Sequence, residues 1–182
     1  MGFTPARYKF CEFIALARSA LRGDHTMPVH RHPLALASIL RNVPSDEELA
    51  QRLERSAVLF GSPPGAMTAR FYERLFLRMP ALRSMFPADL IAQQGKLAGS
   101  IAFVVAHVRS PERLGPTLRE LGRRHVAYGA KAHHYPVVVD EMVGAMGDVA
   151  GPRWTADDAS DWRTALRMVS NEMMAGAAVG EE

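Results

Sequence analysis

The sequence has little cysteine, no long apolar run and none of the common catalytic motifs. Cys11 is the single cysteine among 182 residues, so no disulfide can form within the chain. A reducing compartment is therefore favoured, and we predict a cytoplasmic protein. No uninterrupted apolar run approaches membrane-spanning length, so no transmembrane segment is expected. The chain has no HExxH, GxSxG or CxxC motif and no glycine-rich phosphate loop, so the ordinary catalytic signatures are missing.

Positive charge is concentrated at the N-terminal end of the chain. Residues 1–44 carry six basic and two acidic side chains, a net charge of +4, and the remainder carries −1 of the total of +3. A nucleic-acid-binding domain would cluster its basic residues with aromatic ones on a folded face, so we expect no nucleic-acid partner. We predict that residues 1–44 form a mobile extension. In the alternative, residues 6–21 form a short helix that packs on the main domain or on a second subunit. A homodimer is therefore an alternative that the sequence leaves open.

Residues 45–182 are predicted to form one all-α domain. Their apolar residues recur at helical spacing, and no β-hairpin signal or internal repeat appears. Ser45 and Glu48 form a capping box at the start of the first helix of this domain, and Thr155 with Asp158 caps the last one. Between these two helices, others are expected over about 67–79, 90–108, 110–125 and 133–149. The whole chain is thus predicted to have about seven helices.

His125 ends an apolar stripe on one of these helices. Leu114, Leu118 and Leu121 precede it at steps of three or four residues, so the four side chains share one helix face. A histidine in this place either forms a hydrogen bond within the core or ligates a metal or cofactor there. Both roles stay open on this pattern alone.

Other residues provide what a buried haem requires. A haem iron needs one firm ligand, usually histidine, and its macrocycle needs apolar walls. A gas bound on the open side of the iron needs a hydrogen-bond donor. His125 is available for the iron, Phe86 for the wall, and Tyr72 and Gln93 as donors.

Four segments resemble those of bacterial single-domain haemoglobins and of the haem domain of flavohaemoglobins, which belong to the globin superfamily. The segments are FYERLF (71–76), MPALRSMFP (79–87), QQGKL (93–97) and LGRRHVAYGAKAHHYPVV (121–138). The resemblance covers about residues 46–177. It implies a globin fold, in which the helices surround a pocket for haem b with a pentacoordinate, histidine-ligated iron.

On the proximal side of the haem, the resemblance implies that His125 is the metal ligand. Tyr135 would lie near His125 and help to fix its ring, and Phe86 would pack against the porphyrin. The flavohaemoglobin pattern also has an acid in the last helix, but the matching position falls near Ala177, and Glu172 is more than a turn too early. Because such an acid makes a ligating imidazole more basic, its absence weakens the case for peroxidase-like or fast oxygenase chemistry.

On the distal side, the resemblance implies that Tyr72 and Gln93 donate hydrogen bonds to the gas. Leu97, one turn after Gln93, would crowd the ligand pocket. Gln94 stays an alternative to Gln93, because a shift of one residue in the preceding loop would exchange them.

The function implied by the resemblance is reversible binding of O2, NO and CO, with oxygen transport among the roles. Two alternatives stay open: NO dioxygenation, and gas sensing through the haem-bound helix. The sequence contains no FAD- or NAD-binding domain, so an electron would have to come from a separate reductase. Whether the protein is an enzyme is therefore also open.

Overall fold

Residues 46–178 are described by the structure, a computed structural model, and their regular elements are all helical. The elements are α2 (Asp46–Phe60), α3 (Ala66–Arg78), η2 (Pro80–Met85), α4 (Ile91–His107), α5 (Pro111–Ala127), α6 (His134–Ala150), η3 (Gly151–Arg153) and α7 (Ala156–Ala178). The all-α prediction is confirmed for this part of the chain. The predicted helix over residues 6–21 and the capping residue Ser45 lie outside the described residues. Within the described range, no helix is both long enough and apolar enough to cross a membrane.

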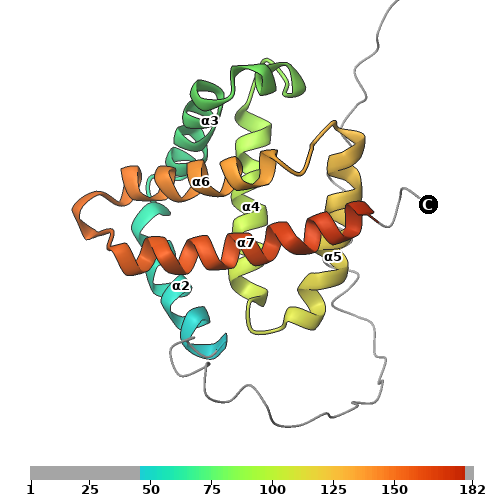
Figure 1. Cartoon of the computed structure of the whole chain (residues 1–182). Helices are drawn as coiled ribbons and strands as arrows, with labels where there is room; N and C mark the ends of the chain where they lie inside the picture. Colours follow the sequence, from blue (N-terminus) through green and yellow to red (C-terminus); the bar gives the residue numbers. More distant parts are fainter. Residues whose placement is uncertain (1–45, 179–182) are drawn as a thin grey trace, which may run out of the picture. The chain divides into compact units, whose positions relative to one another are not determined.

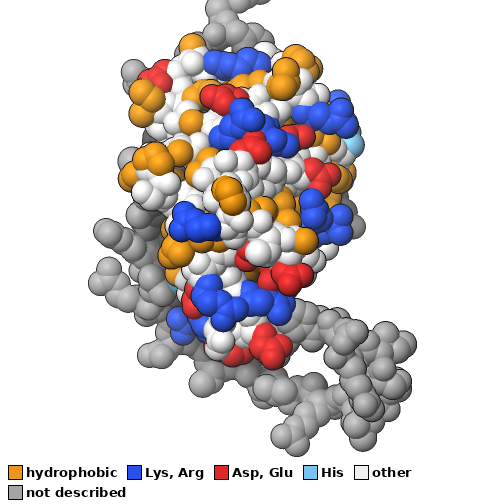
Figure 2. Space-filling view, turned by 90° about the vertical axis from the view of Figure 1, so that its left-hand side faces the viewer, with side chains coloured by type: hydrophobic (Ala, Val, Ile, Leu, Met, Phe, Trp, Pro, Cys, Tyr) orange, Lys and Arg blue, Asp and Glu red, His pale blue; other side chains and the backbone are white. Residues whose placement is uncertain are grey.

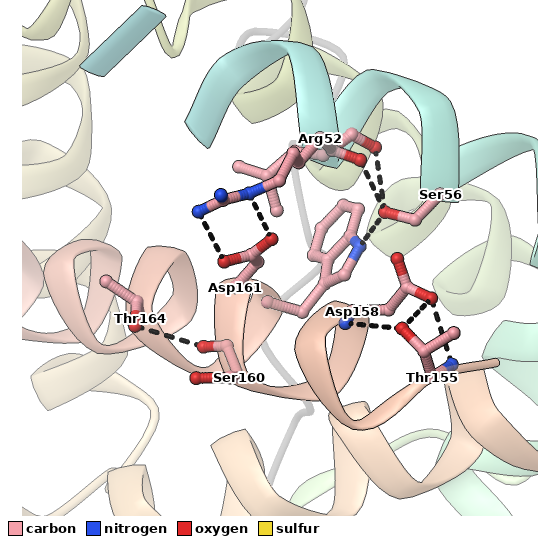
Figure 3. Close-up of polar contacts among 9 residues, drawn as sticks. Arg52, Ser56, Thr155, Asp158, Ser160, Asp161 and Thr164 are labelled. Carbon is pink, nitrogen blue, oxygen red and sulfur yellow. Dashed lines mark hydrogen bonds and ion pairs between the residues drawn. The ribbon is translucent and has the colours of Figure 1, made fainter. Parts of the chain in front are cut away.

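The start of α7 is the capping box that the sequence predicts. The Asp158 backbone N–H donates to the Thr155 hydroxyl at 3.1 Å, and the Thr155 backbone N–H donates to the Asp158 carboxylate at 2.9 Å (Figure 3). Each side chain thus satisfies a backbone donor of the other residue, which ends the preceding turn and begins the helix.

The helices are arranged around the antiparallel pair α6 and α7, which lie side by side, while α4 crosses behind them (Figure 1). In addition, α3 packs on α6, and α5 packs on α7. The main core lies among α2, α3, α6 and α7, and its fully buried large side chains are Trp162, Leu53, Leu75 and Met146. A smaller apolar cluster of Leu114, Leu118 and Met173 joins α5 to α7. The apolar interior therefore consists of two clusters, and α7 contributes to both.

Buried and partly buried polar groups between α2 and α7 set how these helices meet. The Trp162 indole N–H donates to the Ser56 hydroxyl at 2.9 Å, and that hydroxyl donates to the Arg52 carbonyl oxygen at 2.8 Å. One turn away, the Arg52 guanidinium forms an ion pair with Asp161 at 2.7 Å (Figure 3). Because a buried polar group is costly without a partner, these matched pairs favour a single register of the two helices.

Ion pairs on the surface join α3 to α6. Arg70 contacts Asp148 at 2.7 Å, while Arg74 contacts Glu141 and Asp148, each at 3.0 Å. The face shown in Figure 2 likewise has cationic and anionic side chains next to one another rather than a large patch of one sign. The pairs between α3 and α6 help to hold α3, the helix that carries Tyr72.

Candidate functional site

Tyr72 lies in a cluster of aromatic rings formed by α3 and the segment after η2. Its ring centroid is 5.5 Å from that of Phe86 and 5.8 Å from that of Phe76, and the Phe76 and Phe86 centroids are 5.3 Å apart. Only 3% of Tyr72 is exposed. Burial raises the pKa of Tyr72 to about 12, and a side-chain hydrogen bond with Gln93 lowers it in part. The hydroxyl therefore keeps its proton at neutral pH and can donate a hydrogen bond to an acceptor.

Gln93 begins the part of α4 that faces this cluster. It is the glutamine whose side chain forms the hydrogen bond with Tyr72. Both Gln93 and its neighbour Gln94 are partly buried, and Leu97, one turn further along α4, packs against the main core. The structure thus brings Tyr72, Phe86 and Gln93 together, with Leu97 on the same helix as the amide.

His125 lies in the last turn of α5 and is partly buried. Its Nδ1 is 2.9 Å from the Leu121 carbonyl oxygen, and since a carbonyl can only accept, Nδ1 carries the proton. Nε2 then presents a lone pair. Burial lowers the pKa of His125, and the hydrogen bond with Leu121 offsets this in part. The imidazole is therefore neutral at pH 7, which is the form that binds metals.

The helix end after His125 is closed by a Schellman motif. The Ala130 N–H donates to the His125 carbonyl oxygen at 2.9 Å, and the Gly129 N–H donates to that of Val126 at 2.8 Å. Gly129 has a φ of 88°, in the left-handed region that this motif requires and that glycine adopts without strain. The backbone of His125 is consequently fixed by a hydrogen bond from beyond the helix.

The residues around His125 differ from those expected in one respect. The ring in contact with His125 is that of Tyr128, with centroids 6.0 Å apart. Tyr135 packs on the cluster of Leu114, Leu118 and Met173, which Leu121 also touches, and burial raises the pKa of its hydroxyl. Within residues 46–178, no hydrogen bond joins Tyr135 to His125.

Glu172 forms an ion pair with a residue outside the surroundings of His125. Its carboxylate forms an ion pair with Arg119 of α5 at 2.6 Å. As expected from its position in the sequence, it does not supply the acid found in the flavohaemoglobin pattern. The Leu121 carbonyl is thus the group that polarises His125.

The residues present fit a haem. No hydrogen bond, ion pair or ring contact joins His125 to Tyr72, Phe86 or Gln93 in the described part of the chain, so the candidate ligand and the candidate donor pair form two separate groups. Helices α4 and α6 are both 17 residues long and rich in apolar residues. Yet α6 has six buried residues, and α4 has only Ile101. The apolar side chains of α4 are therefore incompletely covered by protein, as expected beside an apolar cofactor.

Arg83 has a role at this site that the sequence did not indicate. Its guanidinium donates to the carbonyl oxygens of Phe86, Pro87 and Ala88 at 3.2, 2.9 and 2.9 Å. It also lies 5.2 Å from the centroid of the Phe76 ring. Arg83 thereby fixes the loop that carries Phe86 and leads into α4. An arginine in a short turn gives no sequence signal for such a role.

Comparison with known proteins assigns the family. The model of the family described as Globin matches residues 69–173, more than half of the chain, so the chain belongs to the globin family. Two solved structures share the fold. A putative nitric oxide dioxygenase from Rhodothermus marinus, engineered as a carbene transferase, has a TM-score of 0.65 at 24% identity, covering 75% of this chain and 94% of that one. A bacterial globin from Campylobacter jejuni has a TM-score of 0.64 at 19% identity, covering 72% and 96%.

Curated relatives include flavohaemoproteins. That of Rhodopirellula baltica is 35% identical over 94 residues, which make up 50% of this chain and 23% of the relative. That of Chromobacterium violaceum is 27% identical over 112 residues, or 60% of this chain and 28% of the relative. The chain thus spans about a quarter of the length of these relatives. Membership of the globin family implies that the chain binds haem.

Proposed function

We propose that this chain is a globin that binds haem b through His125 and binds O2, NO and CO reversibly. A haem supplies an iron atom that takes a diatomic gas when one axial position is open. The polar pair formed by Tyr72 and Gln93 carries the proposal. It lies within an aromatic cluster, where polar groups are costly unless they have a hydrogen-bonding task.

His125 serves as the proximal ligand in this proposal. Its Nδ1–H is held by the Leu121 carbonyl, which sets the tautomer and the ring orientation and leaves Nε2 for the iron. Because burial lowers the pKa of His125, the neutral imidazole is available throughout the physiological pH range. Tyr135 supports the same side through the cluster that it shares with Leu121.

Tyr72 and Gln93 serve as the distal donors. A protonated Tyr72 hydroxyl favours a gas that gains partial negative charge, as O2 does, over CO. Gln93 orients that hydroxyl and supplies a second donor. Phe86 lines the cofactor, while Leu97 limits the space beside it.

NO dioxygenation is the second candidate, favoured by the similarity to flavohaemoproteins and to a putative nitric oxide dioxygenase. The reaction adds O2 to NO and consumes one electron to give nitrate, and a reductase would have to supply that electron. The ion pair between Glu172 and Arg119 weighs against a fast reaction, because the Glu172 carboxylate is then not available to make His125 more basic.

Visible spectra of the purified protein test the proposal in its ferric, ferrous and ferrous–CO forms. We expect one haem per chain, a five-coordinate ferrous form and full reversal of O2 binding. A protein that takes up no haem, or whose ferrous iron is six-coordinate with protein ligands at both axial positions, would contradict the proposal. Mixing the reduced, oxygenated protein with NO and measuring nitrate then separates a gas carrier from a dioxygenase.

A further inference from the structure

We propose that Gly122, Gly176 and Gly129 are positioning residues that together set where His125 stands relative to the haem iron. The inference rests on the haem-binding function proposed above. Two of these glycines bring α5 and α7 into backbone contact, and the third closes the end of α5.

Gly122 and Gly176 form a reciprocal contact between the two helices. A Cβ atom on Gly122 would lie 2.6 Å from the carbonyl carbon of Met173 and closer still to its oxygen. A Cβ on Gly176 would lie 2.5 Å from the Cα of Arg119 and closer still to its carbonyl oxygen. Each glycine thus faces the backbone of the residue three positions before the other one, and no side chain separates the helices.

Such a contact cannot adapt to a larger residue. Carbon atoms need about 3.5 Å, so an alanine at either position has to separate the helices by at least about 1 Å. The atoms in the way belong to the backbone, and a change of side-chain rotamer cannot relieve the clash. Glycine inside a helix also costs roughly 1 kcal/mol relative to alanine, so two buried ones at one crossing indicate that the close approach is needed.

His125 lies directly between the crossing and the helix end. It follows Gly122 by one turn, and its carbonyl accepts the hydrogen bond from Ala130 that depends on the left-handed Gly129. A shift of α5 away from α7 therefore moves the imidazole with its backbone. The tolerance for such a move is small, since changes in the residues that orient a metal ligand typically lower metal affinity by about 10- to 100-fold.

Five alanine variants, two of them controls, test this inference in the full-length haem protein. In Gly122→Ala and Gly176→Ala, we expect haem transfer to an excess of apomyoglobin to be at least about tenfold faster. We also expect a shift of the iron–histidine stretching band of the ferrous form. The matched control is Gly115→Ala, on the same helix and also buried, where the nearest atoms are the flexible end of Arg119 at 3.2 Å and the Glu172 carboxylate. Its haem loss should stay within about twofold of the unsubstituted chain.

The fourth variant keeps the test decisive if the crossing variants do not fold. A Cβ at Gly129 has ordinary contact with Met85 at 3.4 Å, so Gly129→Ala introduces only the strain of its φ. For Gly129→Ala we expect a smaller shift of the iron–histidine stretching band than for Gly122→Ala and Gly176→Ala. Gly65→Ala provides its control, because Gly65 has a similar φ of 83° at the start of α3, away from His125.

Two results would overturn the inference in different ways. If Gly122→Ala and Gly129→Ala lower the melting temperature but leave the band and the haem loss rate at the control values, the glycines are merely structural. If the unsubstituted chain takes up no haem, the proposed function itself is wrong. The spectrum of the unsubstituted protein therefore distinguishes the two failures.

Discussion

The two sides of the candidate site are held in different ways. On the proximal side, His125 is fixed by the backbone: by the Leu121 carbonyl, by the closed end of α5 and by the contact of α5 with α7 through Gly122 and Gly176. On the distal side, Tyr72 is fixed by side chains, namely neighbouring aromatic rings and the amide of Gln93.

This difference has a physical consequence for tolerance to change. A backbone contact leaves no freedom to adapt, whereas a cluster of side chains can repack when one member is replaced. We therefore expect substitutions on the proximal side to affect retention of the haem. Distal substitutions should leave the haem in place and change the behaviour of the gas.

Loss of the proximal ligand should have the largest effect. His125→Ala removes the imidazole, so we expect stoichiometric haem binding to be lost or replaced by a labile, misligated haem. His107→Ala is a closely matched control, because His107 is also partly buried with its Nδ1 2.9 Å from the carbonyl oxygen four residues earlier. Haem content and the ferrous–CO spectrum measure the outcome. Unchanged values in His125→Ala would show that another residue binds the iron.

Tyr72→Phe should have the next largest effect while leaving the haem content unchanged. A hydrogen bond to a charged acceptor contributes about 1.5–3 kcal/mol, so its loss should speed O2 dissociation roughly tenfold to a hundredfold. Dissociation of CO, which gains less negative charge, should change less. Stopped-flow measurements of both gases check this. If O2 dissociates at the original rate, a different group or a water stabilises the gas.

The two adjacent glutamines allow a sharper test of the distal side. Because Gln93 bonds to Tyr72, Gln93→Leu should speed O2 dissociation in the same direction as Tyr72→Phe but more weakly, by several-fold for a neutral hydrogen bond of about 1 kcal/mol. Gln94→Leu is the matched control and should leave the rate nearly unchanged. The opposite order would mean that Gln94 faces the gas when haem is bound.

The pH dependence of stability should reveal the buried His125 in the haem-free protein. Burial lowers its pKa from the usual 6.5, so below that pH the unfolded chain binds a proton that the folded chain does not. The free energy of unfolding should therefore fall as the pH drops from about 6.5 towards the lower pKa of the folded state, with no contribution above 6.5. Urea denaturation at several pH values should show a flatter profile for His125→Gln. If the free energy of unfolding depends on pH in the same way in the unsubstituted chain and in His125→Gln, then His125 is exposed in the haem-free protein.

Removal of the residues before Val43 should have the smallest effect on both the proximal and the distal side of the candidate site. All residues assigned to the site lie between Tyr72 and Tyr135, so we expect a chain that starts near Val43 to fold and bind haem with the same ferrous–CO spectrum. Thermal unfolding of the short and full-length proteins compares their stability. A large loss of haem or of stability in the short form would assign a structural role to the removed segment.

Much of the helical framework was predictable from local sequence. The capping box of Thr155 and Asp158 and the proline at the start of α5 mark helix ends through contacts within a few residues. The apolar stripe ending at His125 places that residue on a helix, because helical periodicity is also local. The four segments that contain Tyr72, Phe86, Gln93 and His125 were sufficient to indicate the family through their resemblance to known globins.

Other features depend on residues that are distant in the sequence. The choice of Gln93 over Gln94 depends on where the Tyr72 hydroxyl lies, and Tyr72 is on another helix. The role of Arg83 is a local exception: the carbonyl groups that it contacts lie three to five residues away, but no sequence pattern predicts that the loop turns them towards the guanidinium. A glycine inside a helix indicates that another backbone segment approaches closely there, but the sequence does not show which segment this is.

The sequence by itself determined the all-α class, the helix that carries the candidate ligand and the set of candidate haem residues. Only the tertiary structure decided which residues meet: Tyr72 with Gln93, Glu172 with Arg119, and Gly122 with the backbone of Met173. The physical reason is the distance along the sequence over which each kind of interaction acts. Helix periodicity and capping act over one or two turns, whereas the partner of Glu172 and the closeness of α5 to α7 follow from packing between segments 50 or more residues apart.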